Sequence, residues 1–222
     1  MVIDFHTHTF LSDGYLNPSA AIYYAWQLNY KAIGLTDHVD AGNWEPVLEQ
    51  TLKACEDANR HWDIAALPGV EITHAPAESI PEIAEKARRF GAKIIVVHGE
   101  SPVEFVPPGT NHAALTSDVD ILAHPGFISE DDVRLAARRG IFLEISARRG
   151  HSLTNGYVAQ KALQFNAPLL INSDAHTIDD YLSDEKVRKV GLGAGLSENQ
   201  FQQLLINAET LLQKIVGKDS VA

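Results

Sequence analysis

Seven short apolar runs rich in β-branched residues recur along the chain, and the segments between them have the length and periodicity of helices. This alternation is typical of a parallel sheet with helices packed outside it, because parallel strands need long crossover connections. Seven units that close on themselves predict an irregular barrel of the α/β class, with an open doubly wound sheet as the alternative. The runs lie at residues 2–5, 31–36, 64–72, 93–97, 119–123, 141–145 and 168–172.

Helix boundaries are also visible in the sequence. Asn17 followed by Pro18 is typical of a helix start, because the side chain can cap free N–H groups and the proline ring suits the first turn. Two capping pairs predict further starts, and four glycines stand where helices should end. These residues are Ser129 with Asp132, Ser197 with Gln200, and Gly91, Gly140, Gly191 and Gly217. The connection 101–118 is the least regular, and it predicts either an ordered loop over a site or a surface crossover.

Length and charge limit the function classes. With 222 residues the chain is long enough for one sizeable core, so we expect a single domain over residues 1–222. The formal net charge of -11 argues against a non-specific grip on long nucleic acid or on an anionic membrane. Cys55 has no second cysteine to pair with, and the first residues lack a signal segment, so we expect a cytoplasmic protein. No apolar run approaches the roughly 18 residues of a membrane span.

Histidine and acidic residues stand at the C-terminal ends of six of the seven runs. His6 and His8 are separated by one residue, so in an extended strand their side chains point to the same face. The C-terminal ends of parallel strands meet at one rim, where such side chains converge. Buried imidazoles and carboxylates are costly when unpaired but are the usual ligands of a divalent transition metal. The rim residues are His6 and His8, Asp37 and His38, Glu71, His98, His124, and Asp174 with His176.

Several neighbouring residues have less specific interpretations. Asp4 and Asp37 are expected to orient ligands through hydrogen bonds. Asp13 is either a turn residue before Gly14 or a further ligand. Glu144 is expected to face inward and to pair with an arginine. We expect His61 to lie on the surface, and His74 and His112 are left without a role.

The sixth run lacks a ligand at its end and is followed by ISARRGH, residues 145–151. Arg148 and Arg149 therefore predict an anion site on the same rim, because guanidinium groups bind phosphate bidentately. The alternative is that these arginines pair with Glu144 or face solvent. The proton donor to a leaving oxygen is expected to be either a ligand-free histidine such as His151 or a metal-bound water.

Taken in order, these motifs resemble the PHP family, the polymerase and histidinol phosphatase domain. The resemblance covers nearly the whole chain and rests on HTH at 6–8, SDG at 12–14, TDH at 36–38, GVE at 69–71, VHG at 97–99, AHP at 123–125 and SDAH at 173–176. It implies a distorted (β/α)7 barrel with two or three divalent metal ions (zinc, manganese or iron) at the C-terminal end of the strands. Amidohydrolases share an initial HxH but often use a bridging lysine at a strand end, whereas Lys93 begins its run.

The resemblance also implies a distribution of ligands. A first metal takes His6, His8, Glu71 and Asp174, a second shares Glu71 with His98 and His124, and a third takes Asp13, His38 and His176. Some relatives have histidine where Asp13 stands. The third set distinguishes this chain from TatD-type nucleases, which have a similar two-metal set.

The leading hypothesis is a metal-dependent phosphoesterase that hydrolyses a small phosphorylated metabolite, such as histidinol phosphate or a nucleotide-like phosphate. Glu71 would bridge two ions that activate a hydroxide. Arg148 or Arg149 would stabilise the charge on the phosphoryl oxygens, and His151 or a metal-bound water would protonate the leaving oxygen. The alternatives are an exonuclease-like or cyclic phosphodiesterase protein of the same family, and a non-catalytic metal-binding module.

Overall fold

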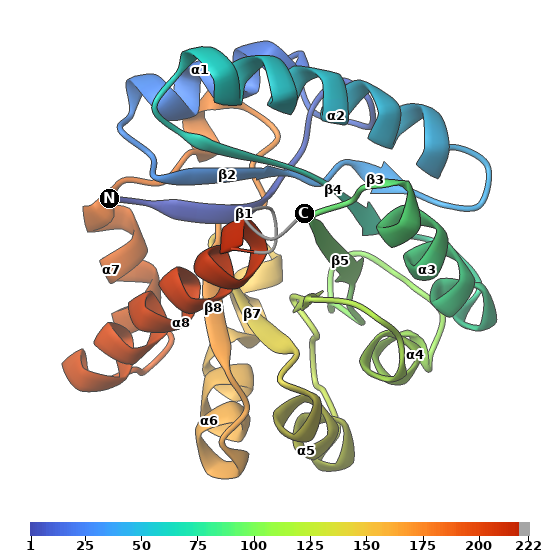
Figure 1. The fold of residues 1–222 in the computed structure, drawn as a ribbon. Coiled ribbons are helices and arrows are strands. Elements are labelled where there is room, and N and C mark those ends of the chain that lie inside the picture. Colours follow the sequence, from blue (N-terminus) through green and yellow to red (C-terminus); the bar gives the residue numbers. More distant parts are fainter. Residues whose placement is uncertain (218–222) are drawn as a thin grey trace.

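Parallel strands form one sheet that is rolled into a nearly closed barrel (Figure 1). The computed structural model describes residues 1–217. The strands are β1 (Ile3–Thr7), β2 (Ala32–Leu35), β3 (His38–Val39), β4 (Ala65–Ile72), β5 (Ile94–His98), β6 (Ile121–Ala123), β7 (Phe142–Ser146) and β8 (Leu169–Asn172). Their order is β1-β2-β4-β5-β6-β7-β8, with β3 paired to β4. Each run that the sequence predicted contains a strand, and the barrel is confirmed over the open sheet; β3 is the addition.

The barrel closes between β1 and the segment that follows β8. Thr7 forms a bridge with Ala175, and the backbone N–H of Asp174 donates to the carbonyl of His6 at 3.0 Å. The side chain of Asn172 adds an acceptor for the backbone N–H of Phe5 at 3.0 Å. This closure brings the first and last predicted ligand motifs side by side, although they are more than 160 residues apart in the sequence.

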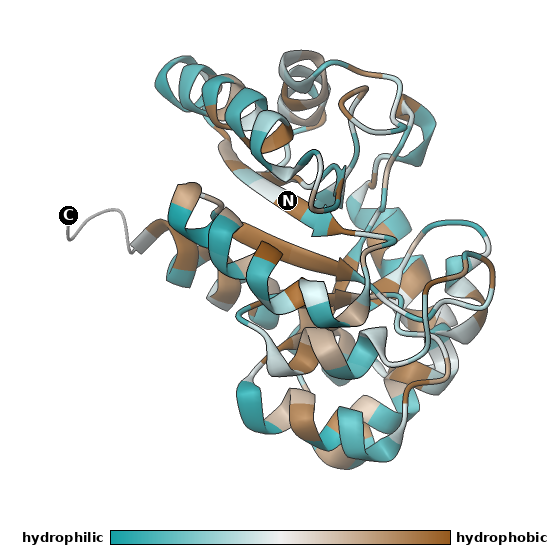
Figure 2. Ribbon diagram, turned by 90° about the vertical axis from the view of Figure 1, so that its right-hand side faces the viewer, coloured by the Kyte–Doolittle hydropathy of each residue, from teal (hydrophilic) through white to brown (hydrophobic). Residues whose placement is uncertain are grey.

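Helices surround the sheet, with their polar faces outward (Figure 2). They are α1 (Pro18–Gln27), α2 (Trp44–His61), α3 (Ile80–Phe90), α4 (Thr110–Thr116), α5 (Glu130–Arg139), α6 (Asn155–Phe165), α7 (Asp184–Gly193) and α8 (Glu198–Gly217), with short 3-10 turns η1 (Ala77–Ser79), η2 (His151–Thr154) and η3 (Ile178–Asp180). Because α4 occupies part of the connection 101–118, the irregular segment before it is shorter than the sequence predicted.

Most predicted helix boundaries are confirmed. The side chains of Asn17 and Ser129 accept hydrogen bonds from the backbone N–H groups of Ala20 and Asp132. Ser197 and Gln200 bond reciprocally, and Gly91 and Gly140 stand at helix ends. The helix end predicted at Gly217 stays a prediction, because the residues after it lie outside the described part of the chain. Gly191 does not end a helix, because α7 continues through it to Gly193. A Cβ at Gly191 would lie 2.8 Å from Cδ2 of Phe201, so this glycine allows α7 and α8 to pack closely.

The interior of the barrel is apolar toward the N-terminal ends of the strands. Alternate residues of each strand point inward, and α8 covers this end of the barrel with Leu211, Leu212 and Ile215. The inward residues are Ile3, Phe5, Ala32, Leu67, Ile94, Val96, Ile121, Ala123 and Leu170. The remaining strand residues face the helices and form the second, larger part of the core.

β1 departs from strict alternation. Its pairing with β2 shifts register between Asp4 and Thr7, as in a β-bulge. Phe5 packs in the barrel interior, yet His6, the next residue, also points inward toward Glu71 and Glu144. Bulges are common next to functional sites because they redirect side chains. The irregularity therefore lets β1 contribute to the apolar core and to the rim.

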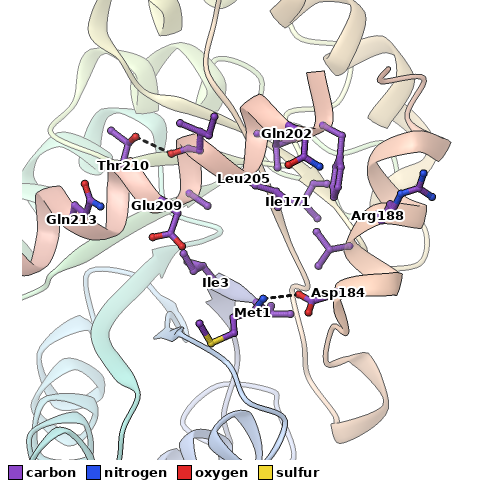
Figure 3. A pocket seen from close by; sticks show the side chains of 16 residues that line it. Met1, Ile3, Ile171, Asp184, Arg188, Gln202, Leu205, Glu209, Thr210 and Gln213 are labelled. Carbon is purple, nitrogen blue, oxygen red and sulfur yellow. Dashed lines mark hydrogen bonds and ion pairs between the residues drawn. The ribbon is translucent and has the colours of Figure 1, made fainter. Parts of the chain in front are cut away.

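A pocket of about 650 Å³ lies at the N-terminal end, between the start of β1, α7 and α8 (Figure 3). The amino group of Met1 forms an ion pair with Asp184 across it at 3.0 Å. It is at the opposite end from the predicted ligands. Among the described residues, no helix is both long and apolar enough to cross a membrane. A single domain over residues 1–222 stays a prediction, and residues 218–222 lie outside the part described.

Candidate metal centre

The C-terminal rim brings together the nine side chains that the sequence predicted as metal ligands. Together with His151 they form four overlapping groups, in each of which one ligand atom from every residue lies within 4.8 Å of the others. The groups are His8, Asp13, His38 and His176; His98, His124 and His151; His6, His8 and Glu71; and His6, His124 and Asp174. Except for Asp13 and His38, these residues are buried. Convergence at the rim is thus a property of the structure, whereas metal binding by each residue stays a prediction.

The first predicted set meets at the end of β1. The Nε2 atoms of His6 and His8 are 3.0 Å apart, and they lie 3.4 and 3.5 Å from Oε2 of Glu71. Oδ1 of Asp174 is 3.3 Å from Nε2 of His8 and 4.0 Å from that of His6. Ligand atoms bonded to one tetrahedral ion at about 2.0–2.1 Å lie roughly 3.4 Å apart. The distances between these atoms, 3.0 to 4.0 Å, are distributed around this value.

The second predicted set occupies the ends of β4, β5 and β6. Nε2 of His124 is 3.6 Å from Oε1 of Glu71 and 3.6 Å from Oδ2 of Asp174. The rings of His98 and His124 are 4.4 Å apart between centroids. Because the two oxygens of Glu71 face different histidines, this carboxylate can bridge two ions.

The third predicted set includes the loop after β1. Oδ1 of Asp13 lies 3.0 Å from Nε2 of His176 and 3.6 Å from Nε2 of His38. Gly14 permits this position, because a Cβ there would meet the carbonyl oxygen of His8 at 2.5 Å. His8 belongs to the same spatial group, so this imidazole lies between the first and third sets.

Hydrogen bonds at Nδ1 orient four of the histidines. His6 donates to Glu144 at 2.8 Å, His98 to the carbonyl of Gly99 at 2.9 Å, and His176 to the carbonyl of Asp174 at 3.0 Å. His38 donates at 2.7 Å to the hydroxyl of Thr73, which itself donates to the carbonyl of Glu71. With the proton fixed at Nδ1, the lone pair of a neutral ring lies at Nε2, which is the atom that faces the centre.

Buried polar atoms without partners provide an independent test of fit. Nδ1 of His8, Nε2 of His98, Nδ1 of His124 and Oε1 of Glu71 have no hydrogen-bond partner within residues 1–217, and the closest approach to Oε2 of Glu71 is that of Nδ1 of His38, at 2.7 Å. An orphaned buried polar group costs about 1–3 kcal/mol, more when it is charged. Nitrogen and carboxylate oxygen are also ligands that zinc, manganese and iron share. The residues present therefore fit divalent ions at this rim.

Charges compensate one another in the metal-free chain. Burial lowers the pKa of His6, but the carboxylates of Glu144, Glu71 and Asp174 outweigh it and hold that pKa well above the ordinary value. Burial raises the pKa of Glu71, yet the charges of His6 and His38 hold it well below its usual range. The pKa of His38 rises to about 9, because Glu71 and Asp13 outweigh the effect of burial. Protons on these imidazoles thus occupy the role that a cation would take.

His8 and His124 behave differently. Burial and the charge of His38 hold the pKa of His8 well below its ordinary value, and burial with His98 does the same for His124. Both imidazoles are therefore neutral near pH 7 and ready to bind a metal. Burial raises the pKa of Asp174 to about 6.

Backbone strain is found at the same rim. His124 and Asp174 have φ values of 28° and 54°, in the left-handed region that non-glycine residues seldom adopt. Such conformations cost of order 1–3 kcal/mol and are concentrated at functional sites. The surrounding contacts hold two candidate ligands in orientations that the chain alone would not favour.

Several predictions about supporting residues need correction. Glu144 faces inward as predicted, but it bonds to His6 and to Nδ2 of Asn172 at 2.9 Å, not to an arginine. The reason is that β7 and β1 meet across the barrel interior, below the arginines. Asp4 holds the backbone N–H groups of Ser173 and His6 rather than a ligand side chain. Asp37 anchors the loop after β1 through Thr9 and Ser12 at 2.7 Å each.

The predicted anion-binding residues lie on the rim in different environments. Arg148 donates from Nη1 to the carbonyl of Asp174 at 3.1 Å, and its Nε is 3.9 Å from Oδ2 of the same residue. Arg149 is exposed and has no hydrogen bond or ion pair within residues 1–217. His151 is buried beside His124, their rings stacked at 4.0 Å. A ligand-free proton donor at His151 stays a prediction.

Sequence reasoning missed Glu104, in the loop between β5 and α4. Its Oε2 is 3.4 Å from Nε2 of His98 and 3.7 Å from Nε2 of His151, and its Oε1 is 3.6 Å from Nε2 of His74. The available signal was a lone acid between the exposed apolar residues Val103 and Phe105. The other histidines lie outside the centre: His61 is exposed on α2, as predicted, and His112 contacts Asp132.

Comparisons with known proteins agree with this architecture. The PHP domain model matches residues 4–122, more than half of the chain. An uncharacterized protein of Methanocaldococcus jannaschii is 46% identical over 218 residues, which cover 97% of this chain and 100% of the relative.

Two solved structures show the same fold. A chain of an archaeal ribonuclease P, solved with mature tRNA, superposes with a TM-score of 0.71 at 18% identity and covers 96% of this chain and 91% of that chain. The histidinol phosphate phosphatase of Lactococcus lactis subsp. lactis, complexed with zinc, L-histidinol and phosphate, superposes with a TM-score of 0.59 at 14% identity and covers 88% and 94%. The family match over more than half of its length shows that the chain belongs to the PHP domain family.

Proposed function

We propose that this protein is a metal-dependent phosphoesterase that hydrolyses a small phosphorylated metabolite. The observation that carries the proposal is the convergence of nine nitrogen and oxygen ligands on a rim that also holds a half-buried arginine. Membership of the PHP family and the phosphate-bound structural neighbour support the same class of reaction. Histidinol phosphate and nucleotide-like phosphates are the candidate substrates.

Different residues of the rim would hold the metal ions and bind the phosphate of the substrate. Glu71 is placed to hold two ions in fixed relation, because its oxygens face His6 and His124 separately. Divalent ions bound here would acidify water and polarise phosphoryl oxygens. Arg148 is placed to hold the phosphate, since its guanidinium lies beside Asp174 and is 30% exposed. Arg149 is free to add a second contact as substrate approaches.

The test is metal analysis of the purified protein beside phosphate release from a substrate panel. The panel contains histidinol phosphate, nucleoside monophosphates and a cyclic phosphodiester, each with manganese, zinc or iron. Two or three ions per chain with release from one compound class would support the proposal and name the substrate class. Fewer than one ion per chain after reconstitution, with no turnover, would overturn it.

A nucleic-acid substrate is the second candidate, because one structural neighbour belongs to a ribonucleoprotein that contains tRNA. The net charge of -11 opposes it, since phosphate backbones require basic surfaces. A single-stranded RNA added to the panel separates the two. Cleavage that weakens steeply with added salt would favour the nuclease, whereas release only from small esters would favour the phosphatase.

A further inference from the structure

The loop between β5 and α4 places two side chains against the second metal set. Ser101, near its start, bonds through Oγ to Nδ1 of His151 at 2.7 Å. Glu104, three residues later, faces Nε2 of the same imidazole and Nε2 of His98. The loop thus positions His151 from one side and presents a carboxylate on the other.

The position of Glu104 follows from contacts that fix the loop at both ends. Oε1 of Glu100 accepts hydrogen bonds from the backbone N–H groups of Gly109 and Asn111, at 2.9 and 3.0 Å. Asn111 in turn bonds to the backbone of Glu100 and to the carbonyl of Pro125. Between these anchors, Val103 packs over Gly150 in the loop after β7. Glu104 therefore points to the centre from an organised turn.

The contact between Glu104 and His98 has the spacing of two ligands of one ion rather than that of a direct hydrogen bond. His98 is 1% exposed and its Nδ1 proton is committed to the carbonyl of Gly99, so Nε2 of the neutral ring presents a lone pair. That atom has no hydrogen-bond partner, yet a carboxylate oxygen lies 3.4 Å away. A charge-assisted hydrogen bond would be about 2.7–2.9 Å long, whereas two ligands on one ion are separated by roughly 3.4 Å.

We propose that Glu104 and His151 bind the same divalent metal ion as His98 and His124. The inference rests on the proposed function, because it adds ligands to a site of that enzyme. It replaces the ligand-free role predicted for His151. It also gives the loop a task, since a carboxylate on a connecting segment can be displaced when a substrate phosphate reaches the ion.

Metal binding of the full-length protein tests this inference without activity. The variants are Glu104→Gln and His151→Gln, with Asp179→Asn as the matched control, because Asp179 is exposed on η3 and its side chain forms no hydrogen bond or ion pair within residues 1–217. Metal-free protein is titrated with Mn²⁺ against a chromophoric chelator, and the absorption of the Co²⁺-loaded forms is recorded. Circular dichroism melting of the metal-free variants establishes that they fold.

The expected result is that Glu104→Gln and His151→Gln each lower the binding affinity for one metal ion by at least about tenfold and change the Co²⁺ spectrum. Asp179→Asn should have the same affinity and spectrum as the wild type. If folded Glu104→Gln and His151→Gln proteins keep the wild-type stoichiometry, affinity and spectrum, the inference is overturned while the proposed function stands. If the wild type itself binds less than one ion per chain, the proposed function fails, and the inference fails with it.

Discussion

The two ends of the barrel use the same strands for opposite purposes. β5 contributes Ile94 and Val96 to the apolar interior and His98, two residues later, to the candidate metal centre. β7 likewise passes from Phe142 near the core to the buried carboxylate of Glu144. Apolar burial at the N-terminal end stabilises the fold by about 25 cal/mol for each Å² removed from water.

The C-terminal end opposes that stabilisation. It carries carboxylate and imidazole atoms without partners and two candidate ligands with positive φ. In barrels of this kind, residues at the C-terminal rim serve chemistry and residues at the opposite end serve stability. The comparison indicates that apolar burial at the N-terminal end of the barrel supplies the free energy that holds the unfavourable arrangement of candidate ligands at the C-terminal end. Changes at the two ends should therefore have separable effects.

The largest expected effect belongs to Glu71→Gln. The amide removes the charge that faces His6 and His38 and cannot bridge two cations, so phosphate release should fall by more than about 100-fold. The metal-free variant should melt below the wild type, because the protonated imidazoles of His6 and His38 lose the buried carboxylate that compensates their charge. Steady-state phosphate release and thermal melting measure the two effects. Full activity in Glu71→Gln would contradict a bridging role.

Phe5→Ala tests the opposite end. Phe5 is completely buried in the barrel interior beneath the metal centre. Its truncation should lower the free energy of unfolding by about 3–5 kcal/mol through lost burial and a new cavity. Urea titration gives the stability, and metal analysis of the folded variant should return the wild-type number of ions. A Phe5→Ala protein of normal stability that loses metal would show that the two ends are not separable.

Glu144→Gln lies at the boundary between the two regions. Glu144 accepts the Nδ1 proton of His6, and removing such a partner of a metal-binding histidine typically costs 10–100-fold in affinity. We expect that range for one ion in a chelator competition. Asn17→Ala is the control, because this helix cap is remote and its loss costs only about 1 kcal/mol. Unchanged affinity in Glu144→Gln would remove the orienting role from this carboxylate.

The regular parts of this architecture were predictable because they repeat. β-branched runs separated by helical segments admit few topologies, and the parallel direction of the strands places every C-terminal end at one rim. Residues such as His98 and His124 could therefore be brought together from their positions alone. Their side-chain type then restricted the chemistry to metal binding or a hydrogen-bonded cluster.

The irregular parts depend on contacts that the sequence does not encode locally. The bulge in β1 arises from its pairing with β2, so strict alternation could not show that Phe5 and His6 both face inward. The partner of Glu144 depends on how β7 and β1 meet across the interior. Glu104 is one of two glutamates in the loop between β5 and α4, and the contacts of Glu100 and Asn111 that anchor this loop direct Glu104 to the rim.

The smallest expected effect concerns pH, and it separates the metal-free from the metal-loaded centre. The pKa of His38 is about 9 in the folded metal-free chain and near 6.5 when unfolded. Its protonation therefore stabilises the fold fully below pH 6.5, and this contribution is lost as the pH rises through 9. His6, whose pKa is also raised, acts in the same direction. His8 and His124 are neutral in the folded chain and lose protons only in the unfolded chain near pH 6.5, which is a smaller, opposing effect confined to the start of this window.

A bound metal reverses this pH dependence. Ligation requires neutral imidazoles, so metal displaces protons from His6 and His38, and affinity should rise by up to about tenfold per pH unit for each displaced proton. The urea midpoint of chelator-treated protein should thus fall from pH 6.5 through 7.5 to 8.5. The increase in that midpoint when Mn²⁺ is added should become larger over the same pH range. His38→Gln should flatten both trends. A metal-free midpoint that rises over this range would contradict protonated imidazoles as stand-ins for the cation, and the C-terminal rim would then be held together by some other balance of charge.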